Sequence, residues 1–142
     1  MTVSEMIASH PVDPALEPTS LSEAIEACLE ASAASTACAD ACLAEEMVAD
    51  LRECIRRDLD AADVLTTTAK VLGRHVAVDL GLTRVVLEAA TVSAKRCASE
   101  CEDHAAMHVH CAVCAQACRR AEAACRALLE ALREMTHQPE ER

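Results

Sequence analysis

The chain has 142 residues, of which 52% are apolar, and a formal net charge of −11. That length supplies one hydrophobic core. The acidic charge argues against binding to DNA, RNA or anionic membranes. The chain has no Phe, Tyr or Trp, so it lacks the side chains on which single-stranded nucleic acid stacks. With two Gly and four Pro, tight turns are too few for a many-stranded β fold.

The N-terminal part of the chain contains a tail and the first expected helix. Residues 1–19 hold three Pro and show no clear period, so we expect a flexible tail. A first helix is expected from Ser20, as its N-cap, to about Met47, because Glu23 follows Ser20 at capping-box spacing. A second helix is expected from about Ala49 to Leu72, where Gly73 is a natural terminator.

Two further helices are expected at about 78–104 and 107–135, followed by a C-terminal tail at 137–142. Four helices of similar length with short links predict an all-α protein, an up-down-up-down four-helix bundle that forms one metal-binding domain over residues 20–136. The charge is unevenly distributed along the chain. Residues 1–51 contain acidic side chains but no Lys or Arg, and the first basic residue is Arg52.

The ten Cys residues follow the helical repeat. Cys111, Cys118 and Cys125 are seven residues apart, and Cys97 and Cys101 form an i,i+4 pair. Such spacing places thiols on one face of a helix, where they can line the bundle axis.

Position along the axis separates the cysteines into two sets. At 1.5 Å per residue, eight of them fall within roughly 16 Å of the end where the first helix meets the second. These eight are Cys38, Cys42, Cys54, Cys97, Cys101, Cys111, Cys114 and Cys118. Cys28 and Cys125 are expected as a separate pair in the other half, beyond an Ala, Leu and Val layer. The sequence therefore predicts a Cys-lined core at one end.

Further potential metal ligands surround that end. His104, Met107, His108 and His110 lie on the link before Cys111, and Met47 closes the first helix. Thiolate, thioether and imidazole are ligands for soft metals, and Cu(I) prefers thiolates. We therefore expect several Cu(I) ions bridged by thiolates, with the His and Met side chains admitting and releasing them. Loading is expected to release protons from the thiols.

Other chemistries for the same cysteines remain open. Zinc would use two short-spaced pairs, of which Cys111 and Cys114 form one. An Fe–S cluster would use four convergent thiols. Disulfides would use the C-x9-C spacings of Cys28/Cys38 and Cys101/Cys111, and a catalytic Cys111 would need His110 as its base. Buried Cys can also serve as a small apolar residue.

The N-terminus lacks the basic and apolar regions of a secretory signal, and no run of residues is long and apolar enough for a membrane span. We expect a cytoplasmic protein, where thiols stay reduced. Reduced thiols favour metal binding over disulfides.

Several motifs resemble the cysteine-rich four-helix-bundle copper storage proteins, in particular their cytosolic bacterial branch. The similarity covers about residues 21–132. It is carried by Glu26-Ala-Cys28, Cys38-Ala-Asp-Ala-Cys42, Glu53-Cys54-Ile-Arg56, Cys97, Cys101 and His108-Val-His110-Cys111-Ala-Val-Cys114-Ala-Gln-Ala-Cys118, continuing to Cys125. The resemblance implies a homo-oligomer, typically a tetramer, whose core Cys bind many Cu(I) ions. A protein that donates or accepts copper is a further expected partner.

The chain departs from the family where further core Cys are expected. Those positions are Ala24, Ala31, Ser35, Ala61, Leu65, Leu87, Ala90, Ala94 and Ala121. The remaining thiols fit Cu(I) storage, buffering or detoxification at reduced capacity. An enzyme or electron carrier with a small Cu or Fe–S centre is the alternative, although no catalytic residue is assigned. A structural protein, with its acidic first helix paired to Arg side chains of the fourth, is a third reading.

Overall fold

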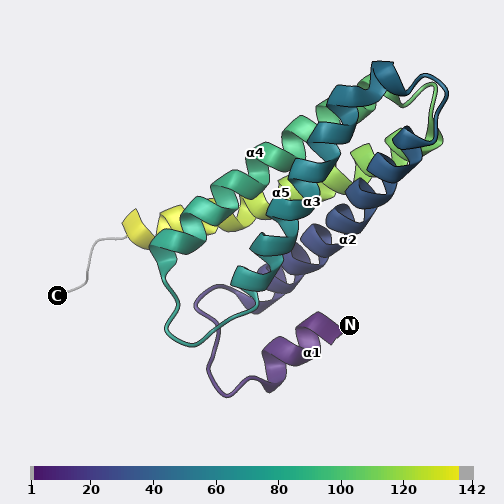
Figure 1. Cartoon of the computed structure of the whole chain (residues 1–142). Helices are drawn as coiled ribbons and strands as arrows, with labels where there is room; N and C mark the ends of the chain where they lie inside the picture. The colour runs from purple at the N-terminus through teal and green to yellow at the C-terminus, as the bar shows by residue number, and fades with distance from the viewer. Residues whose placement is uncertain (1, 138–142) are drawn as a thin grey trace.

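Four long helices pack side by side in this computed structural model, which describes residues 2–137 (Figure 1). The elements in chain order are α1 (Thr2–Ser9), α2 (Pro18–Leu43), the 3-10 turn η1 (Val48–Leu51), α3 (Arg52–Leu72), α4 (Leu80–His104) and α5 (Val109–His137). Helix α2 contacts α3 and α5, and α4 contacts the same two helices. The up-down-up-down four-helix bundle is therefore confirmed. Among the described residues, no helix has both the length and the apolar composition that a membrane span requires.

Helix α2 begins earlier than the sequence predicts. The N-cap is Glu17, whose carboxylate accepts hydrogen bonds from the backbone N–H of Thr19 at 2.9 Å and of Ser20 at 2.7 Å. Pro18 occupies the first turn, where its fixed φ suits the helix. The prediction of Ser20 as N-cap is therefore wrong, because a carboxylate upstream satisfies the free N–H groups first.

The other helix ends lie close to their expected positions. Helix α2 stops at Leu43, four residues before the expected end, and η1 leads into α3. Helix α3 ends at Leu72, and Gly73 is its C-cap. The Gly73 N–H donates a hydrogen bond to the Ala69 carbonyl, and its φ of −79° is not left-handed. Asp79 caps α4 by accepting a hydrogen bond from the Leu82 N–H at 3.1 Å.

The segment expected to be a flexible tail contains α1. Ile7 and Leu16 are 6% and 7% exposed and join the core, and α1 contacts α2. In Figure 1, α1 lies at the end of the bundle away from the α2–α3 link. The His10 ring meets His75 edge-on, with the ring centroids 4.9 Å apart. The apolar side chains of Ile7 and Leu16 pack against the bundle, and this is enough to order a segment whose sequence shows no helical periodicity. Of the expected C-terminal tail, residues 138–142 lie outside the described residues.

Cys, Ala and Leu side chains make up most of the core. Cysteines occupy the half near the α2–α3 link, and Ala with Leu occupies most of the remainder. All nine positions where further Cys are expected are fully buried: Ala24, Ala31, Ser35, Ala61, Leu65, Leu87, Ala90, Ala94 and Ala121. The nine positions that lack the expected Cys are therefore core positions, and all of them except Ser35 carry an apolar side chain.

Candidate metal centre

The cysteines gather inside the bundle, near the links between α2 and α3 and between α4 and α5. All ten are free thiols and buried. Seven of them and Asp58 form overlapping groups, in each of which the ligand atoms lie within 4.8 Å of one another. The groups are Cys38, Cys42, Cys54 and Cys111; Cys38, Cys54, Asp58 and Cys101; and Asp58, Cys97, Cys101 and Cys114. Because successive groups share members, they form one continuous arrangement, here called the thiol stack.

Contacts within the thiol stack join different helices. The Sγ atoms of Cys54 and Cys101 lie 3.7 Å apart. Those of Cys38 and Cys111 lie 3.9 Å apart, and those of Cys97 and Cys114 lie 4.0 Å apart. These separations are well beyond the roughly 2.0 Å of a disulfide. Four helices therefore supply a set of soft donors that no single helix could present.

Cys118 adjoins the thiol stack through Ser35, a buried hydroxyl. The Ser35 Oγ lies 3.5 Å from Cys118 Sγ, 3.7 Å from Cys114 Sγ and 3.8 Å from Cys97 Sγ. All eight thiols expected at one end are thus brought to that end. Ser35 marks the deep end of this set of eight thiols.

Asp58 is the ligand candidate that the sequence analysis missed. It is fully buried on α3. Its Oδ1 accepts S–H hydrogen bonds from Cys97 at 3.2 Å, Cys114 at 3.3 Å and Cys101 at 3.5 Å. Its Oδ2 is buried and has no hydrogen-bond partner among the described residues. One oxygen of this carboxyl group therefore accepts three hydrogen bonds, and the other has none. A buried group with an unpaired oxygen contributes little to the stability of the fold, but it can serve as a metal ligand.

A sequence signal for Asp58 does exist. Asp58 follows Cys54 by four residues and precedes Ala61 by three, so it occupies the core stripe of α3. A charged residue at a core position without an opposite charge is a candidate for function.

Burial favours the protonated form of these groups. Burial, followed by the charge of Cys114, raises the pKa of the Asp58 carboxyl to about 8. Burial, followed by the charge of Cys54, raises the pKa of the Cys111 thiol to about 11. Burial also raises the pKa of Cys42. Near neutral pH these ligands carry protons, which a bound cation would displace.

His110 connects the thiol stack to the outside. Its Nδ1 lies 3.5 Å from Cys38 Sγ and 3.6 Å from Cys111 Sγ, and its Nε2 lies 3.1 Å from Glu45 Oε1. His108 is 8% exposed and stacks on the His110 ring, with the centroids 5.2 Å apart. We call this region, with residues 44–51 and 105–108, the mouth. Glu45 is a second acidic residue that the sequence analysis missed.

The other expected ligands at the mouth lie apart from the thiols. His104 contacts Glu100 on its own helix, with Nε2 3.3 Å from Oε1. Met107 is 61% exposed and Met47 is 40% exposed. Within the described residues, all three therefore stand outside the network of thiol contacts.

Cys28 and Cys125 form the separate pair that their position along the bundle axis predicts. Their Sγ atoms lie 3.4 Å apart and both residues are fully buried. By residue count, buried Ala31 and Ala121 separate this pair from Ser35 and Cys118. An apolar layer therefore divides the two sets of thiols.

The fold and the buried ligands define a four-helix bundle with a thiol-lined core at one end. The family model described as "Copper storage protein" matches residues 17–130. The chain therefore belongs to the copper storage protein family.

Individual relatives agree in fold and sequence. The copper storage protein Ccsp from Streptomyces lividans, loaded with 10 copper equivalents, is 48% identical with a TM-score of 0.89, covering 91% of this chain and 98% of that one. A structure of copper loading to a cytosolic copper storage protein from the same organism, with five coppers, is 53% identical with a TM-score of 0.78, covering 79% of this chain and 93% of that one. An uncharacterized cysteine-rich protein, YhjQ of Bacillus subtilis, is 32% identical over 73% of this chain and 91% of its own length.

Proposed function

We propose that this protein stores or buffers Cu(I) in the cytosol, holding several ions in a multinuclear thiolate cluster. The observation that carries the proposal is the overlap of the three ligand groups, in which Cys38, Cys54, Cys101 and Asp58 each belong to two groups. A thiolate shared between two groups can bridge two ions. Cu(I) suits such a lattice because it prefers soft ligands.

The site residues take different parts in this proposal. The thiol stack and Cys118 hold the cluster, and Asp58 adds an oxygen donor within it. His110 and His108 pass ions between solvent and Cys38 or Cys111. Cys28 and Cys125 form a minor second site for one ion. His104 and Met107 stay available at the mouth as outer ligands.

The cluster is tested by titrating the anaerobic, metal-free protein with Cu(I) against a chromophoric chelator. Replacing Cys114 and Cys118 together by Ala removes donors from the deep part of the thiol stack, so the Cu(I) count should fall by more than about one ion per chain. Replacing Cys28 and Cys125 together by Ala is the matched control, and should remove no more than about one ion. Circular dichroism checks that both variants keep their helices. An unchanged count in the first variant would contradict the cluster.

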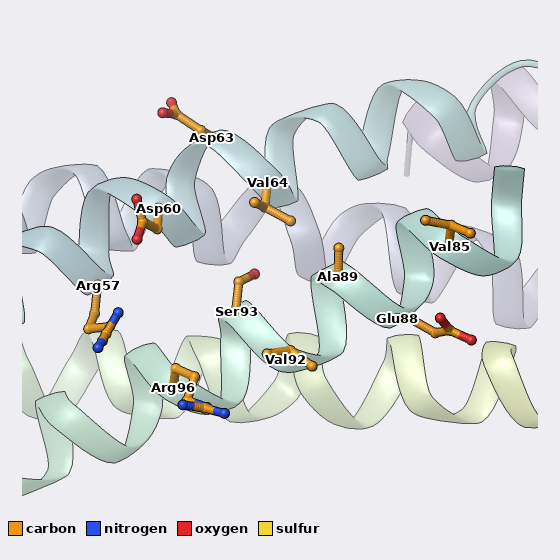
Figure 2. Close-up of a pocket in the computed structure, with 10 residues that line it drawn as sticks. All are labelled: Arg57, Asp60, Asp63, Val64, Val85, Glu88, Ala89, Val92, Ser93 and Arg96. Atoms are coloured by element: carbon orange, nitrogen blue, oxygen red, sulfur yellow. The ribbon is translucent and has the colours of Figure 1, made fainter.

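The protein is also proposed to self-associate through a groove between α3 and α4. Figure 2 shows Val64, Val85 and Val92 along this groove, with Arg57 and Arg96 at one end and Glu88 at the other. Val85 and Val92 are 51% and 53% exposed. An exposed apolar strip of this kind can pack against the same strip of a second copy about a two-fold axis.

Two unpaired charges support a second copy as the occupant. Among the described residues, Arg96 on α4 and Asp63 on α3 have no ion-pair partner within the chain, although both line the groove. By residue count they lie at neighbouring heights, near the middle of the bundle. A two-fold axis that runs along the groove sets α4 of one copy against α3 of the other, and so brings Arg96 of one copy to Asp63 of the other. The tetramer implied by the family resemblance would use this groove as one of its interfaces.

A further inference from the structure

The mouth contains a group of ligands that differs from the thiols in kind. Glu45, on the link after α2, and His108 and His110, at the start of α5, place one ligand atom each within 4.8 Å of one another. Glu45 Oε1 lies 3.1 Å from His110 Nε2 and 3.5 Å from His108 Nδ1. Two imidazoles and a carboxylate from two distant segments thus converge on one point.

The spacing of these atoms suits a tetrahedral ion. An ion with ligand bonds of about 2.0–2.1 Å separates its tetrahedral ligands by about 3.3 Å. The two distances to Glu45 Oε1 lie on either side of that value. Glu45 and His110 are 35% and 25% exposed at their side chains, which leaves a fourth position open to water.

The chemistry of the group favours a borderline divalent ion. Imidazole and carboxylate bind Zn(II) well, whereas Cu(I) prefers the sulfur ligands beneath them. The His108 ring presents Nδ1 to Glu45 Oε1 and is held in that position by its burial, at 8% exposed, and by the stacked His110 ring.

We propose that Glu45, His108 and His110 form a distinct site for a divalent cation of the Zn(II) type at the mouth of the bundle. The site stands beside the proposed Cu(I) cluster and uses none of its sulfur atoms. His110 serves both sides, since its Nδ1 faces Cys38 and Cys111 while its Nε2 faces Glu45. A cation bound there covers the route to the thiols and slows the exchange of Cu(I).

The test uses protein already loaded with Cu(I), so that the thiols are occupied and cannot take the added ion. Zn(II) is titrated against a chromophoric zinc chelator, and the Cu(I) content is measured in parallel. The wild-type protein should bind one Zn(II) per chain. Glu45→Gln should lower the Zn(II) affinity by at least about tenfold, since changes even outside the ligand shell have that effect. Glu46→Gln, the matched control next to it, should leave the affinity unchanged.

Co(II) in place of Zn(II) identifies the ligands. Nitrogen and oxygen ligands give weak visible bands, whereas sulfur ligands add strong charge-transfer absorption in the near ultraviolet. Absence of Zn(II) binding with a normal Cu(I) load would overturn the site and leave the proposed function intact. Zn(II) binding that survives Glu45→Gln, or a sulfur-type Co(II) spectrum, would overturn it as well. If the protein takes up no Cu(I), the proposed function fails, and the Co(II) spectrum alone then decides the divalent site.

Discussion

Asp58 Oδ1 lies 3.2 Å from Cys97 Sγ, and the same oxygen accepts hydrogen bonds from two more thiols. One oxygen atom thus sits where thiols from α4 and α5 meet. It belongs to two of the three ligand groups. In a metal-loaded protein the S–H groups lose their protons, and the oxygen then faces the ions instead.

Replacement of Asp58 by Ala should therefore reduce Cu(I) binding although every Cys is kept. We expect the loss of about one ion per chain, because the oxygen donor is shared by adjacent groups. Asp58→Asn retains an oxygen of the same shape and should lose less. The measurement is Cu(I) titration with a competing chelator. Asp60→Ala, at a partly exposed position of the same helix, is the control, and equal losses in both Ala variants would argue against a ligand role.

Ser35→Cys should increase the capacity for Cu(I). The Ser35 hydroxyl is fully buried and lies within 3.8 Å of Cys97, Cys114 and Cys118. A thiol there is close in size and adds a soft donor, so we expect about one more ion per chain. Ser99→Cys makes the same change at an exposed position of α4. The idea fails if both variants bind the same number of ions after competition with the chelator.

Acid should selectively weaken the start of α2. Backbone hydrogen bonds from Ser20, and then Thr19, lower the pKa of Glu17 from 4.5 to about 2. Because the folded pKa lies below the unfolded value, the cap stabilises the fold above about pH 4.5 and loses this effect as the pH falls toward about 2. Glu17→Gln should lower the melting temperature at pH 7, and the difference from wild type should vanish near pH 2. Thermal unfolding followed by circular dichroism measures it, with Glu23→Gln as the control for loss of one charge.

The groove between α3 and α4 can be tested by exchanging charges. Arg96→Asp places two acids together across the proposed two-fold axis and should weaken self-association by about tenfold or more. Adding Asp63→Arg restores opposite charges and should recover the assembly. Sedimentation at several protein concentrations gives the dissociation constants. Val92→Glu should also separate the copies, whereas Val113→Glu on α5, at similar exposure, should not. A double exchange that stays dissociated would rule out this pairing.

The hydrophobic repeat was sufficient to predict the bundle and the place of most thiols. Helical spacing alone predicted that Cys28 and Cys125 lie side by side, and the structure places their Sγ atoms 3.4 Å apart. This prediction succeeds because side chains three, four and seven residues apart lie on the same face of a helix. All ten cysteines follow this spacing.

The features that could not be predicted from the sequence depend on contacts between distant segments or on local hydrogen bonds. Glu45 resembles any exposed acid until α5 brings His110 to it across 65 residues. Glu17 replaces Ser20 as the cap because of backbone geometry that capping patterns describe only on average. Ile7 and Leu16 order α1 by packing on the bundle, which no period within residues 1–19 reveals.

With copper bound at both proposed sites, the apolar layer between Ser35 and the Cys28–Cys125 pair would separate two populations of ions that exchange at different rates. Ions near Cys42 and Cys111 lie next to the mouth and can leave first, so those that arrive last are released earliest. An ion held by Cys28 and Cys125 would have to cross the layer of Ala31 and Ala121 to reach the thiol stack. Such an ion would be released only when the chain unfolds or is degraded, whereas the outer ions would exchange as the copper concentration in the cell changes.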